Sequence, residues 1–390
     1  MTVEAFEARE EELLDLIYEK LRAGTYRFRP ARRVSIPKPG SAKKRDLGIP
    51  VVMDRVVSQS LHMVLAEIYE PDFTAQNFGF RRGRSQHQAI AHAQRVAAEG
   101  RQWCASIDLR GFFDEIPHRL ILRLLRRKIR DEQLMTLVAR ALKAGTVVTG
   151  IFVKTTKGCP QGSPVSPILS NIVLNELDHE LERRGHRYCR WADDFVILVA
   201  SQRAANRIMG SMTEYLEEKL GLPVNREKSQ VAQLKDVEFL GFQILRGKIR
   251  VSTNGRKRFK AEVRRLTPRN NGQSMYHIIQ RLNEYAEGWV GYYRIQEFRK
   301  IFSELDGFIR SRLRSMQLKK WKKPAKFQRM MIRAGYPVQE ARRTWIKMNT
   351  WQSVRRRPVR FVLNLEWFRR QGLLFLDDYT ERNLKLEFAR

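Results

Sequence analysis

Apolar residues recur every three to four positions in the segment that ends at Gly24, a spacing typical of an amphipathic helix. This apolar face comprises Phe6, Leu13, Leu14, Ile17 and Leu21, and Gly24 suits the position after a helix end. The same periodicity predicts helices at about 54–70, 86–99 and 204–220. The segment up to residue 50 is punctuated by proline and glycine and predicts strands, and the apolar run 103–109 predicts a buried strand. The first half is therefore expected to be mixed α/β.

Two short apolar runs, 188–192 and 195–200, flank the dipeptide Asp193-Asp194. Apolar runs joined by turn-forming residues are typical of a β-hairpin, here with the aspartates at its tip. Upstream, Ser166 followed by Pro167 fits a helix N-cap and the first helical position. We therefore expect a helix over about 166–182, directly before the hairpin.

Beyond residue 260 the pattern is helical throughout. One apolar stripe comprises Ile278, Leu282, Tyr285 and Trp289, and a second comprises Phe298, Phe302, Leu305, Ile309, Leu313 and Met316. Stripes at this spacing are usually packing faces of helices. The C-terminal part is therefore predicted to be a helical appendage.

The composition is that of a globular protein with an unusual charge. Of 390 residues, 43% are hydrophobic and 30% are charged, so the chain can bury a core, and its formal net charge is +32. Residues 243–390 carry 36 basic and 12 acidic side chains, against 38 and 30 in residues 1–242. A charge of this size favours a polyanionic partner, which the C-terminal part is expected to contact most.

Other features of the sequence indicate the cellular compartment. The longest apolar stretch, 195–200, is far shorter than the roughly 20 residues that span a bilayer, so no membrane partner is expected. The first residues are acidic and amphipathic, unlike a secretory or mitochondrial leader. Cys104, Cys159 and Cys189 form no paired zinc motif and no even set for disulfides. These patterns predict a reducing, cytoplasmic compartment and no structural zinc.

Three carboxylates follow predicted strands, Asp108 after one strand and Asp193 and Asp194 between the hairpin strands. Aspartates are common in hairpin turns, so the adjacent pair alone is open to a purely structural explanation. Three carboxylates on rigid strand ends repel one another unless cations lie between them. Two Mg²⁺ ions about 4 Å apart would relieve that repulsion and suit phosphoryl transfer to a hydroxyl.

Seven motifs accompany these carboxylates in a consistent order. They are RRVSIPKPGSAKKRDLGIP (32–50), FGFRRGRSQHQA (78–89), SIDLRGFFDEIPH (106–118), KGCPQGSPVSPILSNIVLNELD (157–178), CRWADDFVIL (189–198), GLPVNREKS (221–229) and VEFLGF (237–242). In order, spacing and chemistry the chain resembles the group II intron (or group II intron-like) reverse transcriptase/maturase family, in particular its short members that lack an endonuclease. LNEYAEGWVGYY (282–293) resembles the thumb or maturase signature of that family, and 318–343 and 367–376 resemble the C-terminal segment of these short members.

The resemblance implies an α+β fold of the right-hand polymerase type. Fingers and palm, with an antiparallel sheet, would occupy residues 1–242, a helical thumb or maturase domain 243–317, and a basic nucleic-acid-binding region 318–390. The implied activity is RNA-directed DNA polymerisation, with an RNA template, a DNA primer or target and dNTPs as partners. The implied location is the bacterial cytoplasm, in association with nucleic acid. No pattern indicates an oligomeric state.

The resemblance also assigns roles near the carboxylates. Asp108, Asp193 and Asp194 would bind two Mg²⁺ ions, with Mn²⁺ as an alternative because oxygen ligands accept both. Lys228 would protonate the departing pyrophosphate or, alternatively, contact a phosphate. The expected nucleotide-binding residues are Lys38, Arg45, Phe113, Gln161 and Gly162. The cations of this set would grip the triphosphate, the aromatic ring would exclude a 2′-hydroxyl, and the glycine would let the backbone approach the nucleotide.

Basic residues alternate with tryptophans in the C-terminal part, a composition that combines phosphate neutralisation with base stacking. The expected nucleic-acid contacts are Arg81, Arg84, Trp321, Lys322, Lys323, Arg355, Arg356 and Arg357. For any single tryptophan of this region, a position in the core is the alternative.

Two residues depart from the family pattern. Trp191 replaces the tyrosine that usually precedes Ala-Asp-Asp, and Asp46 replaces a proline beside Arg45. Two alternatives to polymerisation stay open: a maturase that binds intron RNA and promotes splicing, and a host-adopted polymerase in DNA repair or phage defence. The complete set of three carboxylates favours retained polymerase chemistry, because a pure splicing factor has no need for crowded acids.

Overall fold

The computed structural model describes residues 2–37, 44–148, 151–153, 155–270, 272–347, 350 and 352–379. The chain forms two compact units, one up to Leu240 and the other from Gly241 onward. None of the described helices is long and apolar enough to cross a membrane.

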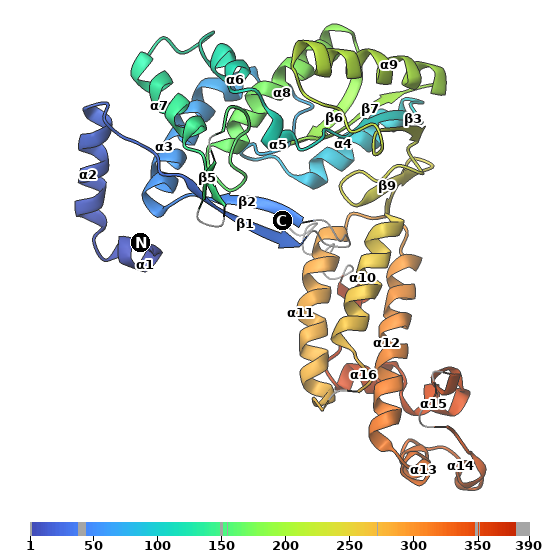
Figure 1. The fold of residues 1–390 in the computed structure, drawn as a ribbon. Helices are drawn as coiled ribbons and strands as arrows, with labels where there is room; N and C mark the ends of the chain where they lie inside the picture. The colour runs from blue at the N-terminus through green and yellow to red at the C-terminus, as the bar shows by residue number, and fades with distance from the viewer. Residues whose placement is uncertain are drawn as a thin grey trace. The chain divides into compact units, whose positions relative to one another are not determined.

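The first unit combines two sheets with surrounding helices (Figure 1). Its helices are α1 (Val3–Glu7), α2 (Glu10–Arg22), α3 (Val52–Tyr69), η1 (Glu70–Asp72), α4 (Gln86–Ala98), α5 (Phe112–Glu115), α6 (His118–Leu125), α7 (Glu132–Lys143), α8 (Ser166–Arg183), α9 (Gln202–Glu214) and the π-helical turn η2 (Tyr215–Lys219). Helix starts carry the expected caps: Ser85 forms a capping box with Gln88 at α4, and Asp131 accepts two backbone N–H bonds at α7.

One antiparallel sheet has the strand order β6-β7-β3-β8, formed by β3 (Trp103–Ile107), β6 (Arg187–Trp191), β7 (Asp194–Val199) and β8 (Gln230–Gln233). Helices α4 and α8 pack against β6, and α9 packs against β3, β7 and β8. Residues 195–199 of β7 are all buried, which explains why this strand reads as a continuous apolar run rather than an alternating one.

A second sheet has the order β2-β1-β4-β5, formed by β1 (Ala31–Pro37), β2 (Lys44–Ile49), β4 (Thr146–Val148) and β5 (Ile151–Val153). Strand β1 pairs antiparallel with β2 and parallel with β4. The backbone N–H of Gly48 at the end of β2 donates to the Gln161 carbonyl (2.8 Å), so this sheet is fastened to the turn before α8.

The structure corrects three local predictions. The first helix is two helices, because Arg9 leaves helical geometry (φ −135°, ψ 33°), and Leu14 is exposed rather than on the buried face. Ser166 does not cap α8: it is the first helical residue, and its hydroxyl donates to the Pro160 carbonyl (2.8 Å). The hairpin turn is Ala192-Asp193, because Trp191 pairs with Asp194, the first residue of β7.

The second unit begins with a hairpin of β9 (Phe242–Leu245) and β10 (Lys248–Val251) and continues as helices. These are α10 (Thr253–Leu266), α11 (Met275–Tyr293), α12 (Lys300–Trp321), α13 (Pro324–Arg333), α14 (Val338–Arg343), η3 (Gln352–Arg355), α15 (Arg357–Val362) and α16 (Leu365–Arg370). Figure 1 shows α10, α11 and α12 side by side, and α12 runs across the predicted boundary between residues 317 and 318.

Aromatic side chains hold the start of the second unit together. The Trp289 ring lies 4.4 Å from that of Phe259 on α10 and 4.5 Å from that of Tyr293. Tyr293 in turn contacts Phe242 of β9, with 5.0 Å between ring centroids. The GWVGYY sequence is therefore a packing motif that joins hairpin and helices.

Cys104, Cys159 and Cys189 are all free and buried. Burial raises the pKa of each thiol well above its ordinary value. None of the three is a reactive thiolate at neutral pH.

Candidate active site

Asp108 is fixed at the end of the central strand β3 by a second segment of the chain. Its backbone N–H donates to the Ser229 hydroxyl (3.0 Å), and its carbonyl accepts from the Asn225 backbone N–H (2.8 Å). The adjoining Arg110 N–H donates to the Pro223 carbonyl (2.9 Å). Residues 223–229 therefore act as a brace for the Asp108 backbone.

Asp193 and Asp194 lie at the turn that joins β6 to β7. Ala192 has φ +55°, a left-handed conformation that closes the tight turn. Because β3 and β7 are antiparallel and Ile107 pairs with Phe195, the next register position joins Asp108 to Asp194. The sheet topology thus brings together carboxylates that are more than eighty residues apart in sequence.

The three carboxylates line one pocket of about 730 Å³. The predicted residues Phe113, Gln161, Gly162 and Lys228 line the same pocket, together with Lys44, Asp46, Phe80, Asp114 and Trp191. Burial raises the pKa of the Asp114 carboxyl, an effect opposed by Arg33 and reinforced by Asp46 and Glu115. The pocket therefore gathers acidic, basic and aromatic groups from both sheets of the first unit.

A buried ion pair lies beneath the turn. Arg190 and Asp178 are both fully buried, and the Arg190 Nε and Nη2 atoms donate to the two Asp178 oxygens at 2.8 and 2.5 Å. Arg190 Nη1 also donates to the Ala192 carbonyl and to Asn171 Oδ1, both at 3.0 Å. This guanidinium therefore fixes the residue directly before Asp193.

Gly79 lies against the other side of the same turn. A Cβ atom at Gly79 would be 2.1 Å from the Ala192 nitrogen, and the Gly79 carbonyl accepts from Asn171 Nδ2 (2.8 Å). Only glycine fits this close backbone approach. The sequence analysis missed Arg190, Asp178, Asn171 and Gly79. One signal was present, since Asn171 and Asp178 are polar residues at an i, i+7 spacing, which places them on one face of α8.

Lys228 pairs with Asp108: its Nζ lies 3.3 Å from Asp108 Oδ2. Both side chains are partly exposed, so the pair faces the pocket rather than the core. The Lys228 ammonium and the Asp108 carboxylate carry opposite charges, so their proximity is favourable.

The predicted nucleotide-binding residues of the palm lie around the turn before α8. Phe113 is partly buried and packs edge-on against Phe112 (5.4 Å between centroids). The Cys159 N–H donates to the Phe113 carbonyl (2.6 Å), which ties α5 to this turn. Gly162 has φ +118°, and a Cβ there would be 2.8 Å from the Gly48 carbonyl oxygen. Glycine is thus required where β2 approaches the turn.

The fingers residues are described only in part. Lys38 lies outside the described residues, and Arg45 lies in β2, paired with Ile36 of β1. Asp46, which departs from the family pattern, pairs with Arg33 (2.8 Å) and accepts a hydrogen bond from the Ser35 hydroxyl (2.5 Å). Its carboxylate is therefore bonded to two side chains of β1.

The donor set suits a divalent cation. Among the described residues, no group of three or more histidine, cysteine, aspartate or glutamate side chains is arranged to hold a metal ion. Mg²⁺ is, however, usually bound through one or two carboxylates together with substrate phosphates and waters. The carboxylate oxygens of this pocket fit that mode of binding.

The predicted nucleic-acid contacts differ in exposure. The Arg81 side chain is 6% exposed and is bonded to Glu70 and to the Thr74 and Asn77 carbonyls, and Trp321 is buried against Phe327. Burial favours packing roles for these two residues. Arg84 is partly buried, with its guanidinium 5.4 Å from the centre of the Phe78 ring. The exposed residues of the set are Lys322, Lys323, Arg355, Arg356 and Arg357.

Two family models match the chain. The family model described as reverse transcriptase (RNA-dependent DNA polymerase) matches residues 36–244. A second model, described as group II intron, maturase-specific domain, matches residues 256–334.

Two relatives align with about 70% of the chain. Protein YkfC of Escherichia coli (strain K12) is 32% identical over 318 residues, which cover 71% of this chain and 82% of the relative. The group II intron-encoded protein LtrA of Lactococcus lactis subsp. cremoris is 27% identical over 340 residues, 70% of this chain and 56% of LtrA. The chain thus spans little more than half of LtrA. The apo telomerase from Candida tropicalis has a TM-score of 0.49 at 10% identity, covering 83% of this chain and 66% of that one.

Proposed function

Because this chain belongs to the reverse transcriptase (RNA-dependent DNA polymerase) family, we propose that it extends a primer 3′-hydroxyl with dNTPs on an RNA template by two-metal phosphoryl transfer. It has the right-hand polymerase fold of that family and carries a maturase-specific domain. We propose a group II intron or group II intron-like origin. We also retain fingers and palm at 1–242, a thumb at 243–317 and a basic region at 318–390.

One observation supports the chemistry above all others. The end of β3 and the β6–β7 turn contribute all three carboxylates to one pocket, which is also lined by Phe113, Gln161 and Gly162, three of the five residues proposed to hold the nucleotide. A pocket of about 730 Å³ is within the size range of small-molecule sites. We therefore assign Asp108, Asp193 and Asp194 as metal ligands.

When bound, two Mg²⁺ ions would polarise the attacking hydroxyl and neutralise the leaving pyrophosphate. Mn²⁺ shares the preference for oxygen ligands. The protein's own contribution is rigid placement: the brace of residues 223–229 holds Asp108, and Arg190 and Gly79 hold the turn that carries Asp193.

The other pocket residues position the nucleotide. We propose that the Phe113 ring, fixed by its contact with Phe112, blocks a 2′-hydroxyl, and that Gln161-Gly162 lies beside the incoming base and sugar. We propose that Lys228 holds or donates a proton at the pyrophosphate; its Nζ, 3.3 Å from Oδ2 of the proposed metal ligand Asp108, supports this role. Lys38 and Arg45 remain proposed triphosphate contacts.

The proposed partners are an RNA template, which includes structured intron RNA, a DNA primer or target, and dNTPs. A net charge of +32 supports binding to these polyanions. The exposed basic residues at 322–323 and 355–357 are proposed contacts in the second unit. We place the protein in the bacterial cytoplasm, associated with nucleic acid.

A second candidate function is supported by the maturase-specific match at residues 256–334. In this case the same basic surface binds intron RNA and promotes splicing without DNA synthesis. The two functions differ in their need for the pocket carboxylates, because RNA binding alone does not require them.

The experiment is dNTP incorporation on an annealed RNA template with a DNA primer, in Mg²⁺ and in Mn²⁺. The wild type is compared with Asp193→Ala/Asp194→Ala and with Glu10→Ala/Glu11→Ala, which removes two exposed carboxylates of α2 that lie outside the pocket. We expect extension by the wild type and the α2 variant and none by the pocket variant. Absence of wild-type extension in both metals, with tight RNA binding retained, would favour the maturase function instead.

A further inference from the structure

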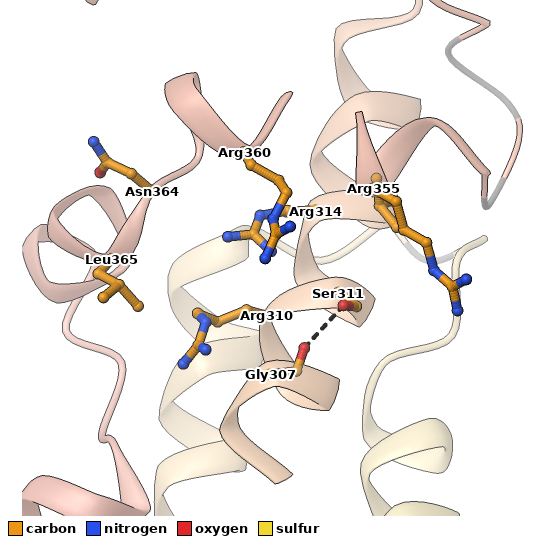
Figure 2. A pocket seen from close by; sticks show the side chains of 9 residues that line it. Gly307, Arg310, Ser311, Arg314, Arg355, Arg360, Asn364 and Leu365 are labelled. Carbon is orange, nitrogen blue, oxygen red and sulfur yellow. Dashed lines mark hydrogen bonds between the residues drawn. The ribbon is translucent and has the colours of Figure 1, made fainter. Parts of the chain in front are cut away.

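A group of arginines on the second unit converges on one space. Arg310 and Arg314 are one helical turn apart on α12, so their side chains share a face of that helix. Arg360 reaches the same space from α15. Figure 2 shows the Arg314 and Arg360 guanidinium groups together, with Arg310 below them and Arg355 directed away.

The pocket that they line has a volume of about 560 Å³, which is the size of a small-ligand site. Its described lining contains no acidic side chain; the remaining residues are Gly307, Ser311, Val354, Asn364 and Leu365. Gly307 adds no side chain to this pocket, and a Cβ atom there would meet nothing closer than Arg310, at 3.8 Å.

The three positively charged side chains of Arg310, Arg314 and Arg360 line the same pocket. Arg314 is only 8% exposed, and burial, followed by the charges of Arg310 and Arg360, lowers its pKa to about 10. Burial and Arg360 also lower the pKa of Arg310, against the opposing effect of Asp306. An anion bound among the three guanidinium groups would remove this repulsion.

The nearby carboxylate of Asp306 does not by itself remove the repulsion among these arginines. Asp306 lies one turn before Arg310, outside the pocket lining, and its carboxylate accepts the backbone N–H groups of Leu376 (3.1 Å) and Asp377 (3.5 Å). The single negative charge of Asp306, which also accepts two backbone hydrogen bonds, does not balance the three positive charges of Arg310, Arg314 and Arg360.

The guanidinium groups of Arg314 and Arg310 are also held in place before any ligand binds. Arg314 Nε donates to the Leu363 carbonyl (2.9 Å), and its guanidinium lies 5.5 Å from the centre of the Phe368 ring. The Arg310 guanidinium lies 5.6 Å from the centre of the Phe375 ring. Fixed planar guanidinium groups lose little freedom on binding and match phosphate oxygens in pairs.

We propose that Arg310, Arg314 and Arg360 form a phosphate-binding pocket that receives one backbone phosphate of a nucleic-acid strand. This pocket deepens the proposed function, on which the identity of the strand rests. Arg355 also lines this pocket, but its side chain is directed away from the other three arginines (Figure 2). The exposed basic residues at 322–323 and 356–357 lie outside the pocket lining.

The test is the salt-dependent binding of fluorescently labelled single-stranded RNA to the full chain, followed by anisotropy. The pocket variant is Arg310→Gln/Arg360→Gln, and the control is Arg329→Gln/Arg333→Gln, which removes the same charge from exposed positions of α13. Arg314 is left unchanged because its loss would free the buried Leu363 carbonyl. Thermal melts confirm that both variants fold.

We expect the pocket variant to bind at least about tenfold more weakly than the control. The slope of log K against log salt should fall by about 0.7, which corresponds to one lost phosphate contact on a single strand. Arg310→Lys/Arg360→Lys, which keeps the charge, should restore binding only in part. Equal losses in the pocket and control variants, or complete restoration by lysine, would overturn the pocket.

A second experiment tests whether the bound phosphate belongs to a nucleic-acid strand or to a small molecule. Inorganic phosphate and a dNTP are tested separately for stabilisation of wild type and pocket variant against heat. Stabilisation of the wild type alone, with RNA binding equal in both proteins, would assign the pocket to a small phosphate compound and overturn the strand proposal. Because these readouts need no polymerisation, failure of primer extension by the wild type is a separate result that concerns the proposed function only.

Discussion

Arg190 and Asp178 form a fully buried, two-bond ion pair whose guanidinium also donates to the carbonyl of Ala192, the residue before Asp193. The pair therefore links the interior of α8 to the turn that carries two of the three proposed metal ligands. A helix and a turn that are separated in sequence are held in one fixed relation.

Loss of one partner of this pair should be costly. Arg190→Met leaves the Asp178 charge buried without a partner, and we expect the free energy of unfolding to fall by about 3–5 kcal/mol. Denaturant unfolding measures this change. Arg183→Met is the control and should cost less than about 1 kcal/mol, because Arg183 is exposed and its partner Glu180 keeps a second pair with Arg184.

Removal of both partners separates stability from positioning. Asp178→Leu/Arg190→Met leaves no unpaired charge and should recover much of the stability. It still lacks the donor to the Ala192 carbonyl, so primer extension should stay well below that of the wild type. Full recovery of extension would show that Arg190 has no role in positioning the turn.

Lys228→Ala should slow single-nucleotide incorporation by about 100-fold, because general-acid groups contribute on that order. Stability should change by less than about 1 kcal/mol, since the pair with Asp108 is partly exposed. Rapid-quench kinetics measure the rate, and Lys235→Ala, an exposed lysine outside the pocket, is the control. An unchanged rate in Lys228→Ala would remove the assignment.

Phe113→Ala should relax the choice of sugar. Without the ring, a 2′-hydroxyl fits, and the ratio of kcat/KM for dNTP over rNTP should fall by about 10- to 100-fold, equivalent to about 1.4–2.8 kcal/mol. Steady-state incorporation of matched dNTP and rNTP pairs tests this. Phe152→Ala, an exposed phenylalanine of β5, should leave the ratio unchanged, and equal ratios in all three proteins would exclude Phe113 as the gate.

Asp306 predicts a pH dependence of stability. Burial raises its pKa from 3.8 to about 6, with the Leu376 N–H, Arg310 and the Asp377 N–H opposing the shift. Because the folded state binds the proton more tightly, this contribution is fully present below pH 4 and is lost as the pH rises through about 6.

The wild type should therefore lose about 2–3 kcal/mol of stability between pH 4 and 7 relative to Asp306→Asn, which does not titrate. Chemical denaturation of both proteins across this range gives the difference. A difference that is constant with pH would contradict the raised pKa.

The sequence predicted the elements that rest on local signals. The helix expected at 86–99 is α4 (Gln86–Ala98), and the expected hairpin is β6–β7, because helical periodicity and turn residues act over a few positions. The seven motifs also predicted the family and the enzyme class, and both are confirmed by the family matches. The roles of individual residues remain predictions.

What the sequence could not predict depends on tertiary packing. Helical or strand periodicity does not distinguish Arg190 or Arg81 from the many exposed arginines, since their burial depends on Asp178 and Glu70, which lie 12 and 11 residues earlier on other elements. The same holds for Asp46, whose partner Arg33 is set by the register of β1 and β2. The pocket arginines on α12 and α15 likewise meet only through helix packing.

The buried thiols have a practical consequence. With Cys104, Cys159 and Cys189 shielded and protonated, maleimide reagents should leave the native chain unmodified. A single cysteine introduced at an exposed position such as Arg356 would then carry a fluorophore at one known place, without prior removal of the natural cysteines. Movements of the second unit during DNA synthesis can thus be followed by optical spectroscopy on an otherwise unaltered enzyme.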